Sequence, residues 1–403
     1  MAHLRERHAQ QLFDELLKYS PIVGIFGHRQ VGKTTFLERS CNSYQSFDSR
    51  EILKRATQDP AEFLTHLGPK PSGIDECHMV PELFPELKEF VRKNKTPGRI
   101  VLSGSIRFSS RSAIKESLTG RIVSVELLPF VLTELLEVER SRFVLQIMNS
   151  SSFSENLESE LPAKDYTARM RVLEKYEENG GLPGILFLRN KRLQNEKLRE
   201  QIEMLLGRDL KLVYPTSVPD LQIREFVEAL ARLELNPVKT TTLRKTTHIA
   251  ETTQKRLLQA LEAIFLIRLI PLEGDRKGLS LYFEDHLERK FLLGEAPDPV
   301  QDFEGLVLRN LRASFNYEPG VDYQVFQWRS GDLRIPFVFR SEGAHLGVIP
   351  ILDPSPSRRE MNLAQRFLAY YPNSKAVFVT RNQRTTEVIT PKILKIPAAR
   401  ILY

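Results

Sequence analysis

The residues with the clearest chemical use form a glycine-rich loop near the N-terminus. In GIFGHRQVGKTTFLERS, residues 24–40, the glycine, lysine and threonine positions fit the spacing G-x-x-x-x-G-K-[ST]. In this pattern, backbone N–H groups and the start of the following helix face phosphate oxygens. The lysine reaches the β- and γ-phosphates, and the threonine hydroxyl binds Mg²⁺. We therefore predict a site for ATP and Mg²⁺ with Thr34 as a metal ligand; its nucleotide-binding residues are Gly27, Gln30, Val31, Gly32, Lys33, Thr34 and Thr35.

Two acidic residues follow the loop some forty positions later. Asp75 and Glu76, in SGIDECHMV, come after a short β-like segment and before a helical pattern. In a nucleotide site, the first carboxylate helps to hold the metal and the second polarises the attacking water. We predict that both residues are catalytic and that Asp75 is also a metal ligand; the alternative is a solvated acidic turn. Cys77 and His78 lack partners at zinc-ligand spacing, which indicates local packing.

Two further polar residues stand at the ends of β-like runs. Ser103 begins the Ser-Gly-Ser end of RIVLSGS, where its hydroxyl would lie beside the γ-phosphate and position water. Arg121, in SLTGRIVSVELLPF, stands where a loop enters a strand and could stabilise transition-state charge in its own subunit or in a neighbour's site. We predict both as catalytic residues. The alternatives are an ordinary strand-to-turn serine and a surface arginine.

The composition places these residues in a globular protein without disulfides. The 403 residues suggest two or three domains, and the 41% hydrophobic content allows a sizeable core in each. Two cysteines make no disulfide framework, which favours a reducing compartment. The first twenty residues lack the apolar core of a signal peptide, and no stretch approaches the ~18 apolar residues of a membrane span. We expect a cytoplasmic protein that does not enter a membrane.

The order of elements predicts an α/β fold. Strands expected at 21–26 and 99–105 alternate with helical segments at 51–67 and 81–93, which indicates a mostly parallel, three-layer domain. A connection rich in Ser, Glu and Asn at 149–165 separates this part from later helices. We expect four parts: an ATPase domain at 1–135, a linker and helical lid at 136–215, a winged-helix-like unit at 216–275 and a mixed α/β domain at 276–403.

Basic residues concentrate in two places. The net charge is +7, and residues 355–403 hold nine basic residues against two acidic ones, which is typical of a polyanion-binding or merely solvated surface. Residues 238–270 have helix–turn–helix texture, with a second helix at 251–263. The start of such a helix enters a DNA groove, so we predict nucleic-acid contacts there; the alternative is a packing or oligomer module. The predicted contact residues are Thr252, Thr253, Lys255 and Arg256.

Taken together, these motifs resemble one family of prokaryotic AAA-type ATPases that carries a C-terminal domain of unknown function. The matching segments run in family order through nearly the whole chain: GHRQVGKTT, IDECHMVPELFPELKEF, VLSGS, SLTGRIVSVELLPF, NGGLPG, GRDL, TTQKRLLQALEAIFLIRLI and LYFEDHL. The resemblance implies ATP binding at Gly27–Thr35, metal and water acids at Asp75 and Glu76, a sensor at Ser103 and a Gly-Arg pair at Gly120 and Arg121. The usual proline after the first loop glycine is His28 here.

The departures from the family lie mostly at the C-terminus. The resemblance implies a nuclease-like core with an acidic strand and a second strand ending in Glu-x-Lys. Here Arg334 and Pro336 replace the acids of the first strand, and Pro350 and Leu352 stand in the second. A metal-dependent nuclease needs carboxylates to hold its metals. Glu304 remains, and Asp332 or Asp353 could substitute. We expect a degenerate, restriction-nuclease-like domain that acts as scaffold, oligomer contact or nucleic-acid surface.

The sequence thus predicts an ATP-hydrolysing AAA-type protein with a P-loop domain, a helical lid, a winged-helix unit and a degenerate nuclease-like domain. The leading hypothesis is a homo-oligomeric motor or remodeller that acts on DNA. The rival hypothesis is a nucleotide-gated switch or scaffold that hydrolyses ATP slowly and acts on a protein partner.

Overall fold

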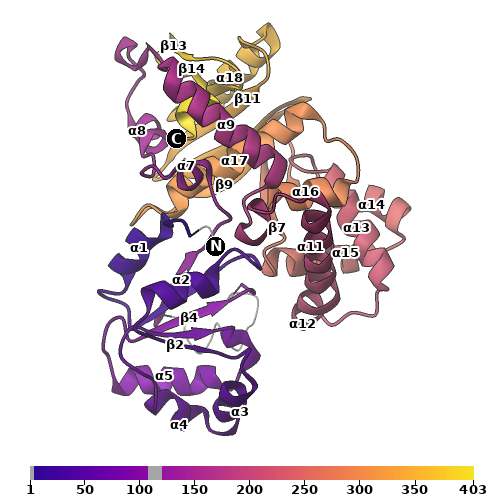
Figure 1. Cartoon of the computed structure of the whole chain (residues 1–403). Coiled ribbons are helices and arrows are strands. Elements are labelled where there is room, and N and C mark those ends of the chain that lie inside the picture. The colour runs from indigo at the N-terminus through magenta and orange to yellow at the C-terminus, as the bar shows by residue number, and fades with distance from the viewer. Residues whose placement is uncertain (1–3, 108–119) are drawn as a thin grey trace.

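Two β-sheets organise the chain, with a group of helices beside them (Figure 1). The computed structural model describes residues 4–107 and 120–403. The N-terminal part of the chain forms the first sheet, and the C-terminal part forms most of the second.

The first sheet has five parallel strands, because each strand is followed by a connection long enough to return to the same edge. The strand order is β2-β3-β4-β1-β5. Strands β1, β3 and β4 are fully buried, as expected for a parallel sheet covered on both faces. The strands are β1 Ile22–Phe26, β2 Ser43–Ser46, β3 Ser72–Asp75, β4 Ile100–Gly104 and β5 Ile122–Glu126.

Alternating side chains of these strands build two apolar layers. One face packs Ile22, Ile100 and Leu102 against α3 (Arg50–Gln58), α4 (Pro60–Thr65) and α5 (Leu83–Lys93). The other face packs Val23 and Ile25 against α1 (Ala9–Leu16) and α2 (Lys33–Ser40). The expected three-layer α/β arrangement is confirmed.

The helical segment expected at 51–67 is two helices. Pro60 cannot continue α3, because it lacks the N–H donor, but it suits the first position of α4. The Asp59 carboxylate caps α4 by accepting a hydrogen bond from the Glu62 N–H at 2.8 Å.

Helices α11 to α15, which lie beside the sheets (Figure 1), surround a second core made mostly of leucine, isoleucine and phenylalanine, whereas α7 to α9 pack in the core of the second sheet. A π-helical stretch, Leu205–Asp209, interrupts the path from α11 to α12, and such bulges are frequent at functional sites. The helices are α7 Leu132–Leu136, α8 Phe143–Asn149, α9 Ala163–Asn179, α10 Pro183–Leu186, α11 Lys191–Met204, α12 Leu210–Val213, α13 Asp220–Arg232, α14 Thr240–Thr247 and α15 Glu251–Ala263.

The second sheet is mixed and has nine strands in the order β6-β13-β14-β12-β11-β10-β9-β7-β8. Helices α17 (Pro299–Asn316) and α18 (Arg358–Tyr370) cover opposite faces. The expected domain boundary at 275/276 falls in the turn between β7 and β8, and β7 also pairs with β9, so the helical part and the C-terminal part share this sheet. The strands are β6 Ser159–Glu160, β7 Ile267–Gly274, β8 Gly278–Phe283, β9 Gln324–Ser330, β10 Leu333–Ser341, β11 Ala344–Ile351, β12 Ser374–Thr380, β13 Thr385–Thr390 and β14 Ile393–Pro397; α16 (His286–Leu293) follows β8 and α19 (Ala398–Ile401) follows β14.

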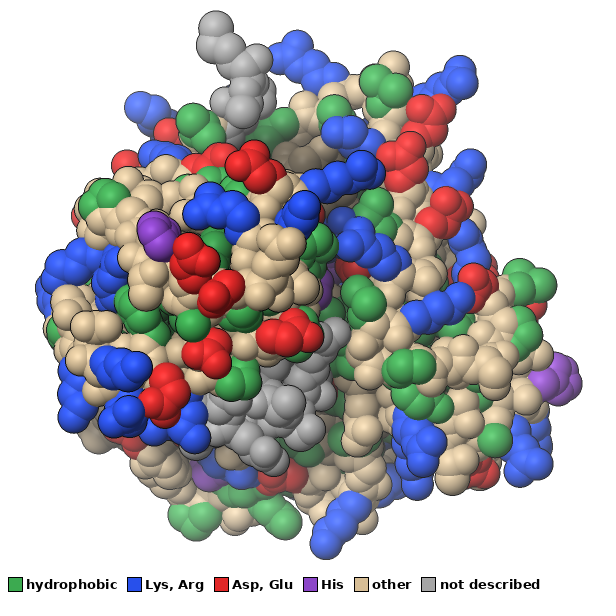
Figure 2. Space-filling view, turned by 90° about the horizontal axis from the view of Figure 1, so that it is seen from below, with side chains coloured by type: hydrophobic (Ala, Val, Ile, Leu, Met, Phe, Trp, Pro, Cys, Tyr) green, Lys and Arg blue, Asp and Glu red, His purple; other side chains and the backbone are tan. Residues whose placement is uncertain are grey.

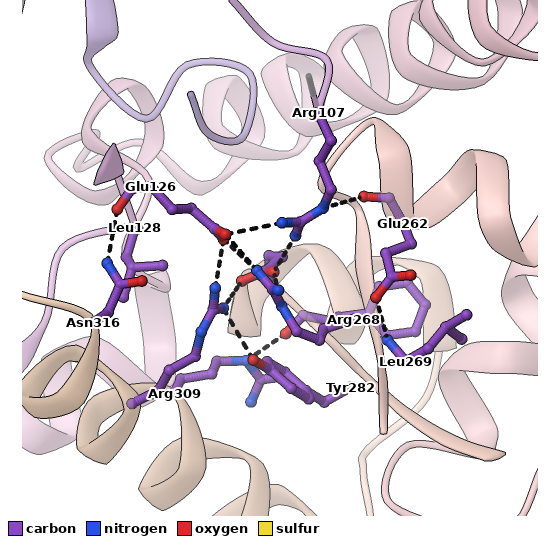
Figure 3. A network of polar contacts seen from close by, with 12 residues as sticks. Arg107, Glu126, Leu128, Glu262, Arg268, Leu269, Tyr282, Arg309 and Asn316 are labelled. Carbon is purple, nitrogen blue, oxygen red and sulfur yellow. Dashed lines mark hydrogen bonds and ion pairs between the residues drawn. The ribbon is translucent and has the colours of Figure 1, made fainter. Parts of the chain in front are cut away.

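A buried network of charges joins the two halves of the molecule (Figure 3). The Glu126 carboxylate, at the end of β5, lies 2.9 Å from Arg107 and 2.5 Å from both Arg268 and Arg312. The Glu284 carboxylate, after β8, lies 2.6 Å from Arg312 and 3.1 Å from Arg268. Burial alone would raise the pKa of each carboxyl, but the surrounding arginines bring both pKa values below the ordinary range.

We expect Glu284→Gln to lower the free energy of unfolding by about 3–5 kcal/mol, because it removes one of the two carboxylates that pair with the buried Arg312 and the partly exposed Arg107 and Arg268. Urea unfolding followed by circular dichroism measures this. Glu225→Gln, the same change at an exposed residue of α13, is the control and should stay within about 0.5 kcal/mol of the wild type. Equal midpoints for the two variants would contradict this role for the network.

The same network predicts an acid limit of stability. Both carboxyls have folded pKa values below their unfolded values, so their contribution is complete above the ordinary glutamate pKa of 4.5. It is lost as the pH falls from 4.5 toward the folded values. Urea midpoints of the wild type between pH 7 and pH 4 should therefore drop mainly below pH 5, and more steeply than those of Glu284→Gln. Parallel curves would show that Glu284 is not the titrating group.

Candidate nucleotide-binding site

The loop between β1 and α2 has the backbone that the glycine spacing predicts. Gly32 stands just before α2 with φ of 97°, a left-handed conformation that suits glycine. At Gly27, a Cβ atom would lie 2.3 Å from the Leu127 carbonyl oxygen, so no larger residue fits there. The loop lies at the N-terminus of α2, where N–H groups and the helix dipole favour an anion.

Lys33 is folded back into the loop. Its Nζ donates hydrogen bonds to the carbonyl oxygens of Gly27 at 3.1 Å and His28 at 2.9 Å. Burial lowers the pKa of this amine, although Glu76 and Asp75 oppose the shift. A phosphate oxygen would supply the charge partner that the two carbonyl groups replace here.

The carboxylate of Asp75, at the end of β3, accepts four hydrogen bonds. Its Oδ2 accepts hydrogen bonds from the Thr34 hydroxyl at 2.6 Å and the Tyr44 hydroxyl at 2.9 Å. Its Oδ1 accepts from the Ser103 hydroxyl and from the Glu76 N–H. The structure therefore brings Thr34, Asp75 and Ser103 together. Sequence reasoning missed Tyr44; burial and the charge of Asp75 raise its pKa, so its hydroxyl keeps the proton and donates.

Glu76 lies beside this cluster and lines the cavity described below. Its φ of 55° is unusual for a residue other than glycine, a kind of strain that clusters at functional sites. Its carboxylate lies 3.2 Å from the His78 Nδ1. Burial would raise the pKa of Glu76, but the contact with His78 and the charge of Lys33 bring it below the usual value. Glu76 is therefore a charged acceptor at neutral pH.

A cavity of about 1060 Å³ opens on the loop. Its polar wall includes Lys33, Thr34 and Thr35, with Arg7 from the N-terminal segment. Its apolar lining includes Phe130, Pro183, Phe187 and Leu188. A cavity of this size and mixed lining suits a mononucleotide, with phosphates on the loop and the base against the apolar wall.

Two loop residues that sequence analysis left without a role hold the loop to distant helices. The Arg29 guanidinium lies 3.0 Å from Asp209, in the π-helical stretch, and the His28 imidazole lies 3.0 Å from Glu288 of α16. Asp209 belongs to GRDL, and Glu288 follows LYFEDHL. The sequence identifies both motifs only as members of the family's series of motifs. Nothing in their spacing shows which distant residues they contact.

Arg121 is not brought to the other predicted catalytic residues. It precedes β5, and β5 pairs with β1 in the register Ile22 to Ile122. It therefore lies at the sheet edge opposite the phosphate loop, about 17 Å away along five strand residues. From there it does not serve the nucleotide of its own subunit. Residues 117–119 of its motif lie outside the described residues.

The predicted nucleic-acid residues lie on α15, whose bounds match the expected helix. Thr252, Lys255 and Arg256 are exposed on one face, and Thr253 is half-buried. Leu257 and Leu261 face the core, as expected. Helices α13, α14 and α15 precede the β7–β8 hairpin here.

Arg334, one of the positions expected to have lost a nuclease acid, forms an ion pair with Glu304, the acid expected to remain. The Arg334 guanidinium on β10 lies 2.8 Å from the buried Glu304 carboxylate on α17. Asp332 is largely exposed at the tip of the β9–β10 turn and faces Arg276 at 3.4 Å. Across residues 4–107 and 120–403, no group of three or more His, Cys, Asp or Glu residues could hold a metal. Arg334 thus pairs with a carboxylate that a metal-dependent nuclease would need to hold its metal.

Residues 19–136 match the family model described as an AAA domain, and residues 170–276 match a domain of unknown function. The similarity to an AAA domain is thus found for residues 19–136, which include the Gly27–Thr35 loop. Uncharacterized proteins from Mycobacterium bovis and Mycobacterium tuberculosis are each 24% identical over 348 residues, which cover 81% of this chain and 69% of each relative.

Two solved structures resemble this chain only weakly. A signal transduction ATPase with numerous domains and a tetratricopeptide repeat sensor, from Pyrococcus horikoshii, is 12% identical with a TM-score of 0.27; the match covers 78% of this chain and 47% of that one. The chain thus spans about half the length of the Pyrococcus protein. A protein from Vibrio cholerae is 12% identical with a TM-score of 0.16, over 89% and 88% of the two chains. Scores this low carry no weight for function.

The donor set fits Mg²⁺. The Thr34 hydroxyl and the Asp75 carboxylate are hard oxygen donors 2.6 Å apart, and Mg²⁺ is typically held by one or two such groups together with substrate phosphates. The helices among the described residues are too short or too polar to cross a membrane.

We expect Glu76→Gln to retain ATP binding and to reduce hydrolysis at least 100-fold, the typical contribution of a positioned base. Lys33→Ala should lose binding itself. Titration with a fluorescent ATP analogue and phosphate release measure the two steps. Glu82→Gln, the same change at an exposed residue nearby, should behave as wild type. Hydrolysis at the wild-type rate by Glu76→Gln would remove Glu76 from the mechanism.

Proposed function

We propose that the chain binds ATP with Mg²⁺ and hydrolyses it at the Gly27–Thr35 loop. The AAA domain indicates nucleotide-binding ATPase activity. The observation that carries the proposal is the contact of Thr34 with Asp75, beside Glu76, at the edge of a mononucleotide-sized cavity. That contact supports a metal position between the loop and the end of β3.

Each residue has a distinct task in this mechanism. Lys33 exchanges its two carbonyl partners for β- and γ-phosphate oxygens, while loop N–H groups hold the remaining oxygens. Thr34 and Asp75 would hold the metal, which would neutralise phosphate charge there. Ser103 and Tyr44 keep the Asp75 carboxylate oriented. Glu76 accepts a hydrogen bond from the attacking water, and its low pKa keeps it ionised for that purpose.

We further propose that the exposed face of α14 and α15 binds DNA phosphates. Five exposed basic residues lie there, and among the residues that the structure describes none of the five is in an ion pair. By contrast, several basic residues of the C-terminal region are already paired, such as Arg381 with Glu177. On the face shown in Figure 2, basic and acidic side chains are interspersed, so net charge alone marks no DNA surface there. The five residues are Lys239, Arg244, Lys245, Lys255 and Arg256.

ATP hydrolysis should rise when DNA is added if the protein is a DNA-dependent motor. We expect Lys255→Glu with Arg256→Glu to abolish that rise and leave the DNA-free rate unchanged, because both side chains are exposed and neither lines the nucleotide cavity. The control is Arg189→Glu with Arg192→Glu, which reverses as much charge on exposed residues before and within α11. Steady-state hydrolysis with single-stranded, duplex and branched DNA, at low and high salt, measures the effect. If both double variants lost the DNA-dependent rise in hydrolysis equally, the face of α14 and α15 would not be a specific DNA-binding surface.

A nucleotide-gated switch is the second candidate, and the buried contacts between units favour it. His28 and Arg29 join the loop to helices, and Arg107 joins the end of β4 to Glu284. In this case the rate of ATP hydrolysis is low, and added DNA does not change it. Arg121 lies at the sheet edge opposite the phosphate loop, so its use in catalysis would require a second copy of the chain; sedimentation with and without ATP tests that homo-oligomer.

A further inference from the structure

The side chain of His28 connects the phosphate loop to α16. Its Nε2 lies 3.0 Å from Oε2 of Glu288, and both side chains are buried. Its Nδ1 lies 2.6 Å from the Arg29 carbonyl oxygen. Both ring nitrogens thus face oxygens that can only accept hydrogen bonds when Glu288 is ionised. Burial by itself would lower the pKa of His28, but the nearby Glu288 side chain brings it above the ordinary value.

Glu288 is held from several sides, so it is a fixed support. Its Oε1 accepts a hydrogen bond from the Gln201 side chain of α11 at 2.5 Å. Asp285 caps α16 through the N–H groups of Leu287 and Glu288, and it also accepts from the Gly181 N–H at 2.7 Å. The segment Glu284–Glu288 therefore receives contacts from the phosphate loop, from the glycine turn before α10 and from α11.

The other end of the connection is the phosphate-binding backbone. The His28 carbonyl oxygen accepts one of the two hydrogen bonds from Lys33 Nζ. The His28 side chain therefore restrains the peptide that holds the lysine.

We propose that Glu288 is a positioning residue for the phosphate loop, acting through His28 to hold the loop in the form that receives a nucleotide. This rests on the proposed ATP site and adds a residue to it from the C-terminal half of the chain. It also gives the LYFEDHLE segment a role: it carries the support for the loop and, through Glu284, the contact with Arg107 after β4.

The test is ATP affinity in three variants of the full chain: His28→Gln, Glu288→Gln and the two together. Each single variant should raise the Kd for a fluorescent ATP analogue about tenfold, which is the lower range for loss of a residue that orients a ligand-binding group. The double variant should bind no more weakly than the weaker single variant, because both remove one interaction. Additive losses, or unchanged Kd in folded Glu288→Gln, would overturn the proposal.

The control removes a buried imidazole from the same helix without touching the loop. His286 lies 3.5 Å from Asp302, and we expect His286→Asn to keep its Kd within about twofold of wild type while lowering the melting temperature. An equal rise in Kd for His286→Asn would show that any damage to α16 weakens binding, and would reduce Glu288 to a structural role.

A measurement on the wild type covers the case in which the Glu288 variants do not fold. Because coupling is reciprocal, ATP should slow amide hydrogen exchange across residues 286–293. No change there would overturn the proposal. Failure of the ATP site itself looks different: the wild type then binds the analogue no better than Lys33→Ala, whatever residue stands at 288.

Discussion

The in-register parallel pairing of β1 with β4 and β5 is the constraint on which the site depends. Phe26 pairs with both Gly104 and Glu126, so three strand ends lie at one level. The phosphate loop, the segment after Ser103 and the Glu126 carboxylate therefore meet at one sheet edge. A shift of any strand by one residue would turn every side chain to the other face. The alternating apolar layers prevent such a shift, so the core keeps the chemistry in place.

Charge, rather than apolar contact alone, joins the units at that edge. Burying arginines and glutamates costs several kcal/mol per ion, which the close partners around Glu126 and Glu284 offset. Apolar packing tolerates small sliding, whereas a buried charge loses its compensation when its partner moves. Such contacts therefore favour discrete arrangements of the units, a property that either a motor or a switch requires.

The sequence allowed prediction of the parts whose signal is local. The phosphate loop, the acids after β3 and the bounds of α15 follow from spacing and periodicity, because each depends on neighbours within a few turns or strands. Tyr44, Asp209 and Glu288 could not be found this way, since their contacts join segments far apart in the chain. Pro60 marks the break between α3 and α4 in the sequence, but the helical periodicity continues on both sides of it and therefore favours one helix over 51–67. Arg121 shows the opposite limit: its motif was recognised, yet only strand register shows which edge it occupies.

The distribution of free charge separates the two basic regions that the sequence treats alike. In the C-terminal region, Arg381, Arg384 and Lys395 face Glu177, Glu160 and Glu387, so part of its positive charge is already neutralised. On α14 and α15, the only nearby acids of these helices, Glu251 and Glu262, accept hydrogen bonds from Thr240 and from the Leu269 N–H instead. The basic side chains there remain available. Counterion release depends on unpaired charge rather than on composition, so each ion pair in the C-terminal region lowers what a polyanion could gain there.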